Sequence, residues 1–325
     1  LSPPKRETNQ YRSYTERDIW RLQTITALRE VGMGLAQIKA ALSEYESGNK
    51  EGLLHDLELQ RSAMASAWLE YKQHMLTTDR IIALLKEERE LPLEEVFVLA
   101  EGSKRLRELR TGWRDRWNFD VQAAAHDETV LTDTDLYEHY DAMLDTVVRW
   151  IHPQPRENGL DLGAGTGNLC GRFMERGARM TAVDQSKEML RICRSKYPEP
   201  ELVTKLGNML AVPCLDQSFD FAVTSFAFHH LTDEQQLLAL EEMRRVLKPR
   251  GRLCIADVMM EDEGAREGCI RQLRAEGKHR LLQAFESKFP AKVDRLTGML
   301  EANGYMTKQK QVTDTLHIIC AIPIR

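Results

Sequence analysis

Three glycines at alternating positions, Gly163, Gly165 and Gly167, constrain this chain more than any other feature of its sequence. Residues 159–168 read GLDLGAGTGN, so a short apolar strand ends directly at a glycine-rich turn. Glycine has no Cβ, and a backbone of this kind turns tightly and lets a ligand approach closely. Asp184 follows at the end of a second apolar run, where an acid accepts hydrogen bonds from both hydroxyls of a ribose. The pattern predicts an open parallel α/β sheet that binds a nucleoside-like ligand.

The charge at the end of the first predicted strand narrows the choice of ligand. Asp161 precedes the glycines, at the place where a dinucleotide site holds a pyrophosphate. A carboxylate repels pyrophosphate and attracts an ammonium group. We therefore expect a nucleoside ligand that carries a positive charge. A plain dinucleotide site and an ordinary turn are the alternatives.

With these residues, the chain resembles the class I methyltransferases that depend on S-adenosylmethionine (SAM). The stretch from Asp161 to Gly167 is similar to their first motif, and the resemblance extends from about Trp117 to Arg325. It implies an α/β fold, a seven-stranded Rossmann-like domain, with SAM as the cofactor. The residues that it assigns to cofactor binding are Asp161, Gly163, Ala164, Gly165, Gly167, Asp184, Gln185, Asn208, Met209, Phe226 and Tyr140.

Two of these assignments have alternatives. Asn208 stands where the family usually has an Asp, and its side-chain oxygen can still accept a hydrogen bond from an adenine amino group. It can equally be a turn residue that bonds its own backbone. Tyr140, with Tyr137, belongs to a segment that resembles one folding over the cofactor in small bacterial members of the family. Their rings can hold a sulfonium by cation–π attraction or simply pack as core.

Methyl transfer depends on positioning more than on acid–base groups, but an acceptor that carries a proton needs a base. His229 and His230 follow the predicted fourth strand, at the sheet edge where substrates bind, and are candidates for this role. Structural hydrogen bonds are the alternative.

Residues 225–228 read SFAF, and methyltransferases of DNA amino groups have an Asp/Asn-Pro-Pro-aromatic turn there. We expect a small-molecule acceptor, with residues 260–290 as a lid over an apolar substrate.

The first ninety residues follow a different pattern. Apolar residues at helical spacing predict two short helices around a Gly-x-Gly break at residues 32–34. A longer helix follows, with apolar positions at alternating steps of four and three, which is typical of a two-stranded coiled coil. We name these positions the seam: Met64, Trp68, Tyr71, Met75, Thr78, Ile82 and Leu85. The seam predicts a homodimer, and packing against its own chain is the alternative.

The stretch from Asn9 to Ile38 resembles the MerR family of transcription regulators from its wing onward. The resemblance covers residues 1–88 and implies a winged helix-turn-helix joined to a long dimerisation helix, with double-stranded promoter DNA as partner. We expect the helix-turn-helix, which the sequence lacks, to precede Leu1; loss of the recognition helix is the alternative. Candidates for contacts with DNA phosphates are Arg6, Tyr11, Arg12 and Tyr14. A solvated loop is the alternative for these residues.

Composition limits the remaining classes of function. The first thirty residues hold six Lys or Arg against four acids, within a chain of net charge −5, which allows a local basic face but excludes a nonspecific polycation. The sequence shows no run of 18 apolar residues and no secretory signal, which predicts a cytoplasmic protein without membrane contact. None of the six cysteines precedes Cys170 and none forms a Cys-x-x-Cys pair, so we expect no metal site.

Together these patterns predict four segments. Residues 1–48 are an all-α winged-helix remnant that binds DNA, 49–90 a coiled-coil dimerisation helix, 91–116 a connector and 117–325 the methyltransferase domain. The predicted function is a transcription regulator whose methyltransferase domain acts on a small molecule, with ligand occupancy coupled to promoter binding. The alternatives are a regulator that senses SAM or a metabolite without catalysis, and a plain small-molecule methyltransferase with a dimerisation arm.

Overall fold

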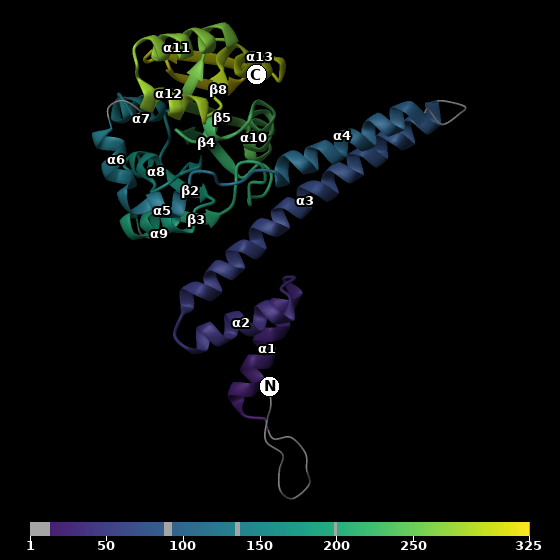
Figure 1. Cartoon of the computed structure of the whole chain (residues 1–325). Coiled ribbons are helices and arrows are strands. Elements are labelled where there is room, and N and C mark those ends of the chain that lie inside the picture. Colours follow the sequence, from purple (N-terminus) through teal and green to yellow (C-terminus); the bar gives the residue numbers. More distant parts are fainter. Residues whose placement is uncertain (1–13, 88–92, 134–136, 198–199, 325) are drawn as a thin grey trace, which may run out of the picture. The chain divides into compact units, whose positions relative to one another are not determined.

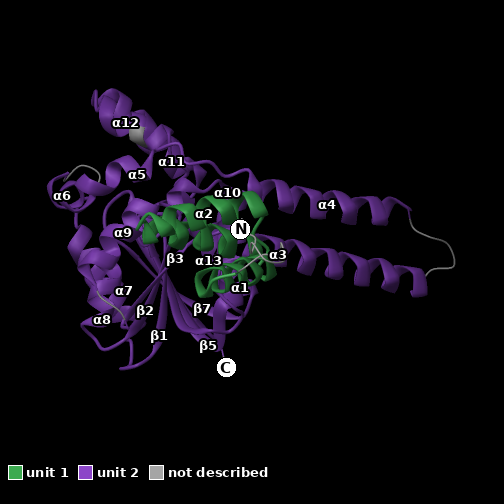
Figure 2. Cartoon of the chain, turned by 90° about the horizontal axis from the view of Figure 1, so that it is seen from below, with its two compact units in different colours: residues 1–64 green, residues 65–325 purple. Residues whose placement is uncertain are grey.

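The computed structural model describes residues 14–87, 93–133, 137–197 and 200–324 (Figure 1). The chain divides into two compact units, residues 1–64 and 65–325 (Figure 2). The boundary between them lies inside one long helix, whereas the sequence patterns place divisions near residues 48, 90 and 116. Residues 91–116, predicted as a connector, belong to the second unit.

The first unit contains α1 (Glu16–Glu30), α2 (Leu35–Glu46) and the beginning of α3 (Lys50–Glu87). The two short helices and the long one match the spacing of the apolar residues. α1 begins with a capping box, in which the Asp18 N–H donates to Thr15 Oγ1 at 3.2 Å and the Thr15 N–H donates to Asp18 Oδ2 at 2.9 Å. The buried core of the unit comprises Leu28, Met33, Ile38, Ala41 and Leu42.

In the second unit, α3 and α4 (Leu93–Thr111) lie side by side, as Figures 1 and 2 show. The hydroxyls of Thr77 and Ser103 are 2.7 Å apart and join the two helices. The seam lies on a different face of α3. Trp68, Tyr71 and Met75 are 58%, 68% and 67% exposed. Within the described residues, the seam therefore does not pack against its own chain.

A mixed sheet forms the centre of the second unit. Its order is β3-β2-β1-β4-β5-β8-β7, and a short strand β6 pairs with the end of β5. The first five strands are parallel, whereas β8 runs antiparallel to β5 and pairs with β7. Their bounds are β1 Asn158–Leu162, β2 Arg179–Asp184, β3 Leu202–Leu206, β4 Phe219–Ser225, β5 Leu247–Met260, β6 Ala291–Lys292, β7 Tyr305–Gln311 and β8 Leu316–Pro323. The predicted seven-stranded sheet is confirmed, with β6 as an addition.

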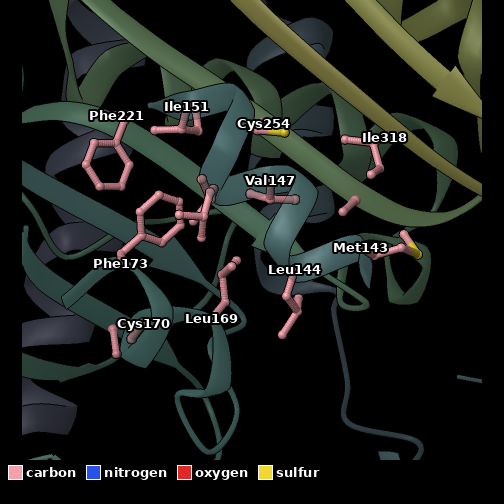
Figure 3. Packing of buried hydrophobic residues seen from close by; sticks show 14 of the residues in the cluster. Met143, Leu144, Val147, Ile151, Leu169, Cys170, Phe173, Phe221, Cys254 and Ile318 are labelled. Carbon is pink, nitrogen blue, oxygen red and sulfur yellow. The ribbon is translucent and has the colours of Figure 1, made fainter. Parts of the chain in front are cut away.

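Buried apolar residues form two clusters in this unit. In the first, shown in Figure 3, the rings of Phe173 and Phe221 lie 4.7 Å apart, and α7 (Tyr140–Ile151) adds Leu144 and Val147. α8 (Asn168–Met174) and α9 (Lys187–Lys196) also contribute to it. The second cluster includes residues of α10 (Asp233–Val246) and α13 (Val293–Ala302). Each fully buried large side chain contributes about 1.5–3 kcal/mol, so the two clusters hold the strand ends in fixed positions.

Two helical segments flank the carboxyl edge of the sheet. One precedes β1 and contains α5 (Phe119–Gln122), η1 (Ala123–Ala125) and α6 (His126–Thr132); we name residues 117–133 and 137–140 the cover segment. The other follows β5 and contains α11 (Glu263–Ala275) and α12 (His279–Glu286). A short turn, η2 (Phe228–His230), follows β4. Throughout the described part of the chain, no helix is both long and apolar enough to cross a membrane.

Candidate active site

A cavity opens at the carboxyl ends of β1 and β4, the point where the strand order reverses and where open α/β sheets bind ligands. Its empty space is about 1000 Å³, including the open mouth. The glycine loop, the ends of β2 and β4, the loop after β3 and the cover segment form its walls. Of the predicted cofactor residues, the walls contain Tyr140, Gly163, Ala164, Gly165, Asp184, Gln185, Asn208, Met209 and Phe226.

The glycine loop follows β1 with a backbone that other residues adopt rarely. Gly165 has φ +54°, and its N–H donates to Asp184 Oδ2 at 2.9 Å. A Cβ on Gly163 would lie 2.4 Å from the Cβ of Ala227, a distance that real contacts exclude. The loop thus keeps its bare backbone against both β4 and the cavity. Gly167, also predicted for the cofactor, instead packs behind the loop against Cys193.

Asp161 lies beneath the loop and does not line the cavity. Its side chain is 1% exposed, and Oδ2 accepts a weak hydrogen bond from Cys170 Sγ at 3.3 Å. Among the described residues, Oδ1 has no hydrogen-bond partner. Burial raises the pKa of this carboxyl from 3.8 to about 7. An unsatisfied buried acid is costly, and a cation bound nearby would relieve that cost.

Asp184 and Asn208 use their oxygens differently. The two oxygens of Asp184 accept one backbone N–H each, from Gly165 and from Ser186 at 2.8 Å, so each keeps a lone pair for a ligand hydroxyl. Asn208 Oδ1 accepts from the N–H groups of Leu210 at 2.9 Å and Ala211 at 3.0 Å, which occupies both lone pairs. The oxygen of Asn208 therefore closes a turn by bonding the nearby backbone, which agrees with the alternative interpretation of this residue. It has no lone pair left for an adenine amino group.

An aromatic wall stands beside the glycine loop. The ring of Phe226 lies 5.2 Å from that of Tyr140 and 5.5 Å from that of Tyr137. Phe226 has φ +52°, a left-handed conformation that costs about 1–3 kcal/mol and is typical of functional sites. Its N–H donates to the carbonyl of Ala256 at 3.0 Å, which helps to hold the strained turn. Three ring faces in one wall suit a ligand cation.

Two acids of the cover segment, Asp120 and Asp127, bond it to residues of the glycine loop and of α9. Asp127 Oδ1 accepts from Thr166 Oγ1 at 2.5 Å, and its Oδ2 pairs with Lys196 Nζ at 2.9 Å. Asp120 Oδ1 accepts from Ser186 Oγ at 2.6 Å. The sequence shows these acids next to aromatic residues, but their partners become visible only in the fold. Through these bonds the cover segment contributes Phe119, Gln122, His126, Val130, Tyr137 and Tyr140 to the cavity walls.

The two predicted catalytic histidines have different surroundings. His229 is 3% exposed and does not line the cavity. Its Nδ1 bonds Asp257 Oδ1, while Asp257 Oδ2 accepts the N–H of Phe228 at 2.6 Å. Burial lowers the pKa of His229, although Asp257 opposes the shift. His229 thus holds the turn after β4, and the structural alternative describes it better than a catalytic role.

His230 lines the cavity and stands among aromatic rings. Its ring lies 4.2 Å from that of Trp117 and 5.0 Å from that of Phe119. Burial lowers the pKa of His230 well below its usual value, and the nearby His229 and Lys288 lower it further. Its Nδ1 is buried without a partner in the described part of the chain. The imidazole is therefore neutral near pH 7 and can accept a proton.

Sequence reasoning missed two residues that shape this site. Trp113, at the end of the apolar pattern in α4, lines the cavity and donates from Nε1 to the carbonyl of His230 at 3.3 Å. Asp257 is the one acid in the apolar run 253–260, and this isolation is the signal of a buried polar partner. Neither contact is local in the chain, so spacing alone does not reveal it.

The predicted DNA contacts can be placed only in part. Arg6, Tyr11 and Arg12 lie outside the described residues. Tyr14 is described, is 50% exposed and directly precedes the capping residue of α1. Its contact with DNA stays a prediction.

The chain is similar to known proteins in both of its parts. Residues 160–255 match a family described as a methyltransferase domain, and residues 1–45 match the MerR HTH family of regulatory proteins. A protein of Alkaliphilus oremlandii, described as an uncharacterized methyltransferase, is 30% identical over 207 residues, which are 62% of this chain and 94% of that protein. A similarly described protein of Oceanobacillus iheyensis is 29% identical over 186 residues, 57% of this chain and 84% of that protein.

Solved structures share the fold of the second unit. A methyltransferase in a complex with the Haloferax volcanii Trm112 methyltransferase activator is 18% identical, with a TM-score of 0.50, over 65% of this chain and 100% of that chain. Phosphoethanolamine N-methyltransferase 2 of Haemonchus contortus is 14% identical, with a TM-score of 0.50, over 65% of this chain and 59% of that chain. At these identities the likeness concerns the fold alone.

The raised pKa of Asp161 predicts a pH-dependent stability penalty. Between pH 4 and 7 the unfolded chain loses this proton while the folded chain keeps it, so the free energy of unfolding falls as the pH rises. D161N removes the effect. We expect D161N to gain stability relative to the wild type from pH 4 to pH 7, by up to roughly 4 kcal/mol, and no further above pH 7. Urea unfolding across this pH range measures the difference.

Asp220 provides the matched control on β4. Burial opposes its ionisation, but hydrogen bonds from Lys248 Nζ at 2.7 Å and from the N–H of Asn158 at 2.9 Å lower its pKa. The carboxylate of Asp220 therefore stabilises the fold at neutral pH and stops doing so as the pH falls. D220N should be less stable than the wild type at pH 7, and this deficit should stay nearly constant down to about pH 4 and shrink only below the ordinary pKa of 3.8. Parallel pH profiles for D161N and D220N would contradict the assignment.

Proposed function

This chain belongs to the methyltransferases, and from that premise we propose that it transfers the methyl group of SAM to a small organic molecule. When bound, SAM supplies a methyl group on a positively charged sulfur. The first cavity carries complementary groups for its parts. Asp184 offers lone pairs to the ribose hydroxyls, and the faces of Tyr140 and Phe226 suit the sulfonium. Asp161 does not line the cavity, and its buried carboxyl beneath the glycine loop offers a counter-charge to the ammonium.

The unpartnered Oδ1 of Asp161 is the observation that best supports this assignment. The methyl acceptor forms its new bond with a lone pair while the carbon–sulfur bond breaks, so the positive charge on sulfur disappears. An acceptor that carries a proton passes it to a neutral imidazole. We assign this role to Nε2 of His230, because Nδ1 of the same ring is buried.

Replacement of His230 tests the proposed base. We expect H230A to lower the rate of methyl transfer to acceptors that carry a proton by about 10²–10⁴-fold and to change SAM affinity by less than threefold. Transfer of a tritium-labelled methyl group from SAM, measured across a library of small acceptors, gives the rate, and calorimetry gives the affinity. H229N, which changes the neighbouring ring, should mainly lower stability. A normal rate in H230A would remove the base from the proposal.

We further propose that the N-terminal part binds promoter DNA as a homodimer, in the cytoplasm. The match to MerR regulatory proteins supports DNA binding, with Arg6, Tyr11, Arg12 and Tyr14 as phosphate contacts. The seam supports the dimer, because its large apolar side chains are exposed while another face of α3 carries the contacts to α4. A second copy of the same seam would remove this surface from water.

A charge placed in the seam tests the dimer. Tyr71 is 68% exposed, so Y71E leaves the fold of one chain unchanged but places a carboxylate in the proposed interface. We expect the dissociation constant of the dimer to rise at least tenfold, as measured by sedimentation equilibrium. M306E is the control, because Met306 on β7 is also exposed, at 57%, and lies outside the seam. Equal dimer strength in both variants would contradict the proposed interface.

Coupling between the cavity and promoter binding has a physical route through α4. Near one end of this helix, Gln235 Nε2 donates to the carbonyl of Leu109 at 3.0 Å, and Arg105 pairs with Glu234 at 2.7 Å. Just beyond the helix, Trp113 enters the cavity wall. At Ser103, in the same half of the helix, α4 contacts α3, which carries the seam and contributes residues to both units. A ligand that contacts Trp113 thus acts on the arm that carries the proposed dimer interface.

This route predicts the behaviour of a W113A variant. For the wild type, we expect saturating SAM to change the affinity for a promoter fragment, selected from random DNA, by about 5–150-fold. In W113A the change should fall below twofold, although SAM still binds. Fluorescence anisotropy with and without SAM gives both affinities. Equal promoter affinity with and without SAM in the wild type would refute the coupling.

One observation favours a second function. Trp117 and Phe119 stand close to His230 and restrict its access to an acceptor. A regulator that senses SAM without transferring its methyl group would tolerate such enclosure. Tight SAM binding without turnover across the acceptor library identifies this function. Turnover without any DNA binding instead identifies a plain enzyme whose N-terminal part serves only for dimerisation.

A further inference from the structure

A second cavity lies under α11 and α12, beside the one already described. Its empty space is about 570 Å³, including the open mouth. Val258 near the end of β5 and Leu316 at the start of β8 form its floor. Because β8 is antiparallel to β5, both residues lie at the carboxyl edge of the parallel strands. This is the edge at which open α/β sheets bind their ligands.

The helices above this cavity turn apolar side chains toward it. Leu273 of α11 and Leu281 and Phe285 of α12 line the cavity. α11 has no fully buried residue, and the ion pair of Arg274 with Glu286, at 2.8 Å, joins the two helices at the surface. Phe285 belongs to the first buried cluster and Leu273 packs against that cluster, and the remaining apolar surface of the two helices borders the hollow. An apolar ligand would complete their burial.

Lys288 is the cation of this cavity. Its side chain lines the hollow, and burial lowers the pKa of the ammonium. Within the described ranges, no carboxylate lies within ion-pair distance of it. The acids whose charge acts on it have other partners: Asp133 pairs with Arg280, and Asp257 accepts hydrogen bonds from the ring of His229 and the backbone N–H of Phe228. A half-buried ammonium without its own counter-ion is a binding group for an anion.

The two cavities are neighbours. Tyr137 lines the first cavity and Glu138, the next residue, lines the second. The charge of Lys288 also acts on His230, which lines the first cavity. A ligand in the second cavity therefore lies next to the site proposed for SAM. The carboxylate of Glu138 at the second cavity pairs with His139 at 3.3 Å and disfavours a second negative charge on the ligand.

We propose that the second cavity binds the methyl acceptor and that this acceptor is an amphipathic organic acid. Its apolar body packs under α11 and α12, and its single acidic group pairs with Lys288. The inference rests on the proposed methyl transfer, whose other half is the SAM site in the first cavity. It adds the chemical class of the acceptor and the residue that selects it.

Binding of decanoate to the full-length protein tests the acid site. The matched probes are decanol, which has the same chain without charge, and decyltrimethylammonium, which has the opposite charge. By calorimetry, we expect decanoate to bind at least tenfold more tightly than decanol and the cation not to bind. K288M should reduce the preference for decanoate over decanol below twofold, and K288R should retain it. An unchanged preference in K288M, or no decanoate binding to the wild type, would overturn the proposal.

Filling the cavity separates this proposal from the proposed function. L273W should abolish decanoate binding and methyl transfer to acids but leave SAM affinity within twofold, and L281W is the second variant if L273W does not fold. Methyl transfer to acceptors without an acidic group, at the same rate in K288M, would refute the acceptor class while methyl transfer itself stands. Decanoate and SAM binding without transfer to any acid would refute the acceptor role, and only the absence of transfer to every acceptor in the library would refute the proposed catalysis as well.

Discussion

The walls of both cavities depend on the hydrogen bonds that the carboxylate of Asp257 accepts. It is fully buried in β5 and bonds the ring of His229, the N–H of Phe228 and the N–H of Val258. These bonds turn His229 inward and leave the next residue, His230, at the wall of the first cavity. Val258, directly after Asp257, forms part of the floor of the second cavity. Without this acid, several buried polar groups would lose their partner at once, and the turn after β4 would lose its shape.

The buried charges of the two cavities are opposite in sign. Beneath the first cavity, burial raises the pKa of Asp161, an acid without a full set of partners. In the second cavity, burial lowers the pKa of Lys288. Each group disfavours its charged form until an opposite charge arrives. A cation near Asp161 and an anion near Lys288 would each stabilise the charged form of these groups, which is consistent with the two proposed ligands of opposite charge.

The sequence predicts the parts of this site that are local in the chain. The glycine loop and Asp184 follow from short motifs and from apolar periodicity, since strand ends and tight turns are set by neighbouring residues, whereas the seven-stranded sheet is implied by the family resemblance. The contrast between His229 and His230 could not be predicted, because it depends on Asp257, 28 residues further along. Asn208 shows the opposite case, in which a purely local turn bond replaces the role implied by a family resemblance.

Helix α4 also has a mechanical property. Its 19 residues span roughly 28 Å at a rise of about 1.5 Å per residue. One end is held at α10 by Gln235, close to the indole of Trp113, and the helix is otherwise joined to α3 along its side. A tilt of about 5° at the held end, acting over this length, moves the far end by roughly 2.5 Å. If a ligand tilts the helix near Trp113, as the proposed coupling requires, the displacement grows along α4 and is largest at the end farthest from the cavity.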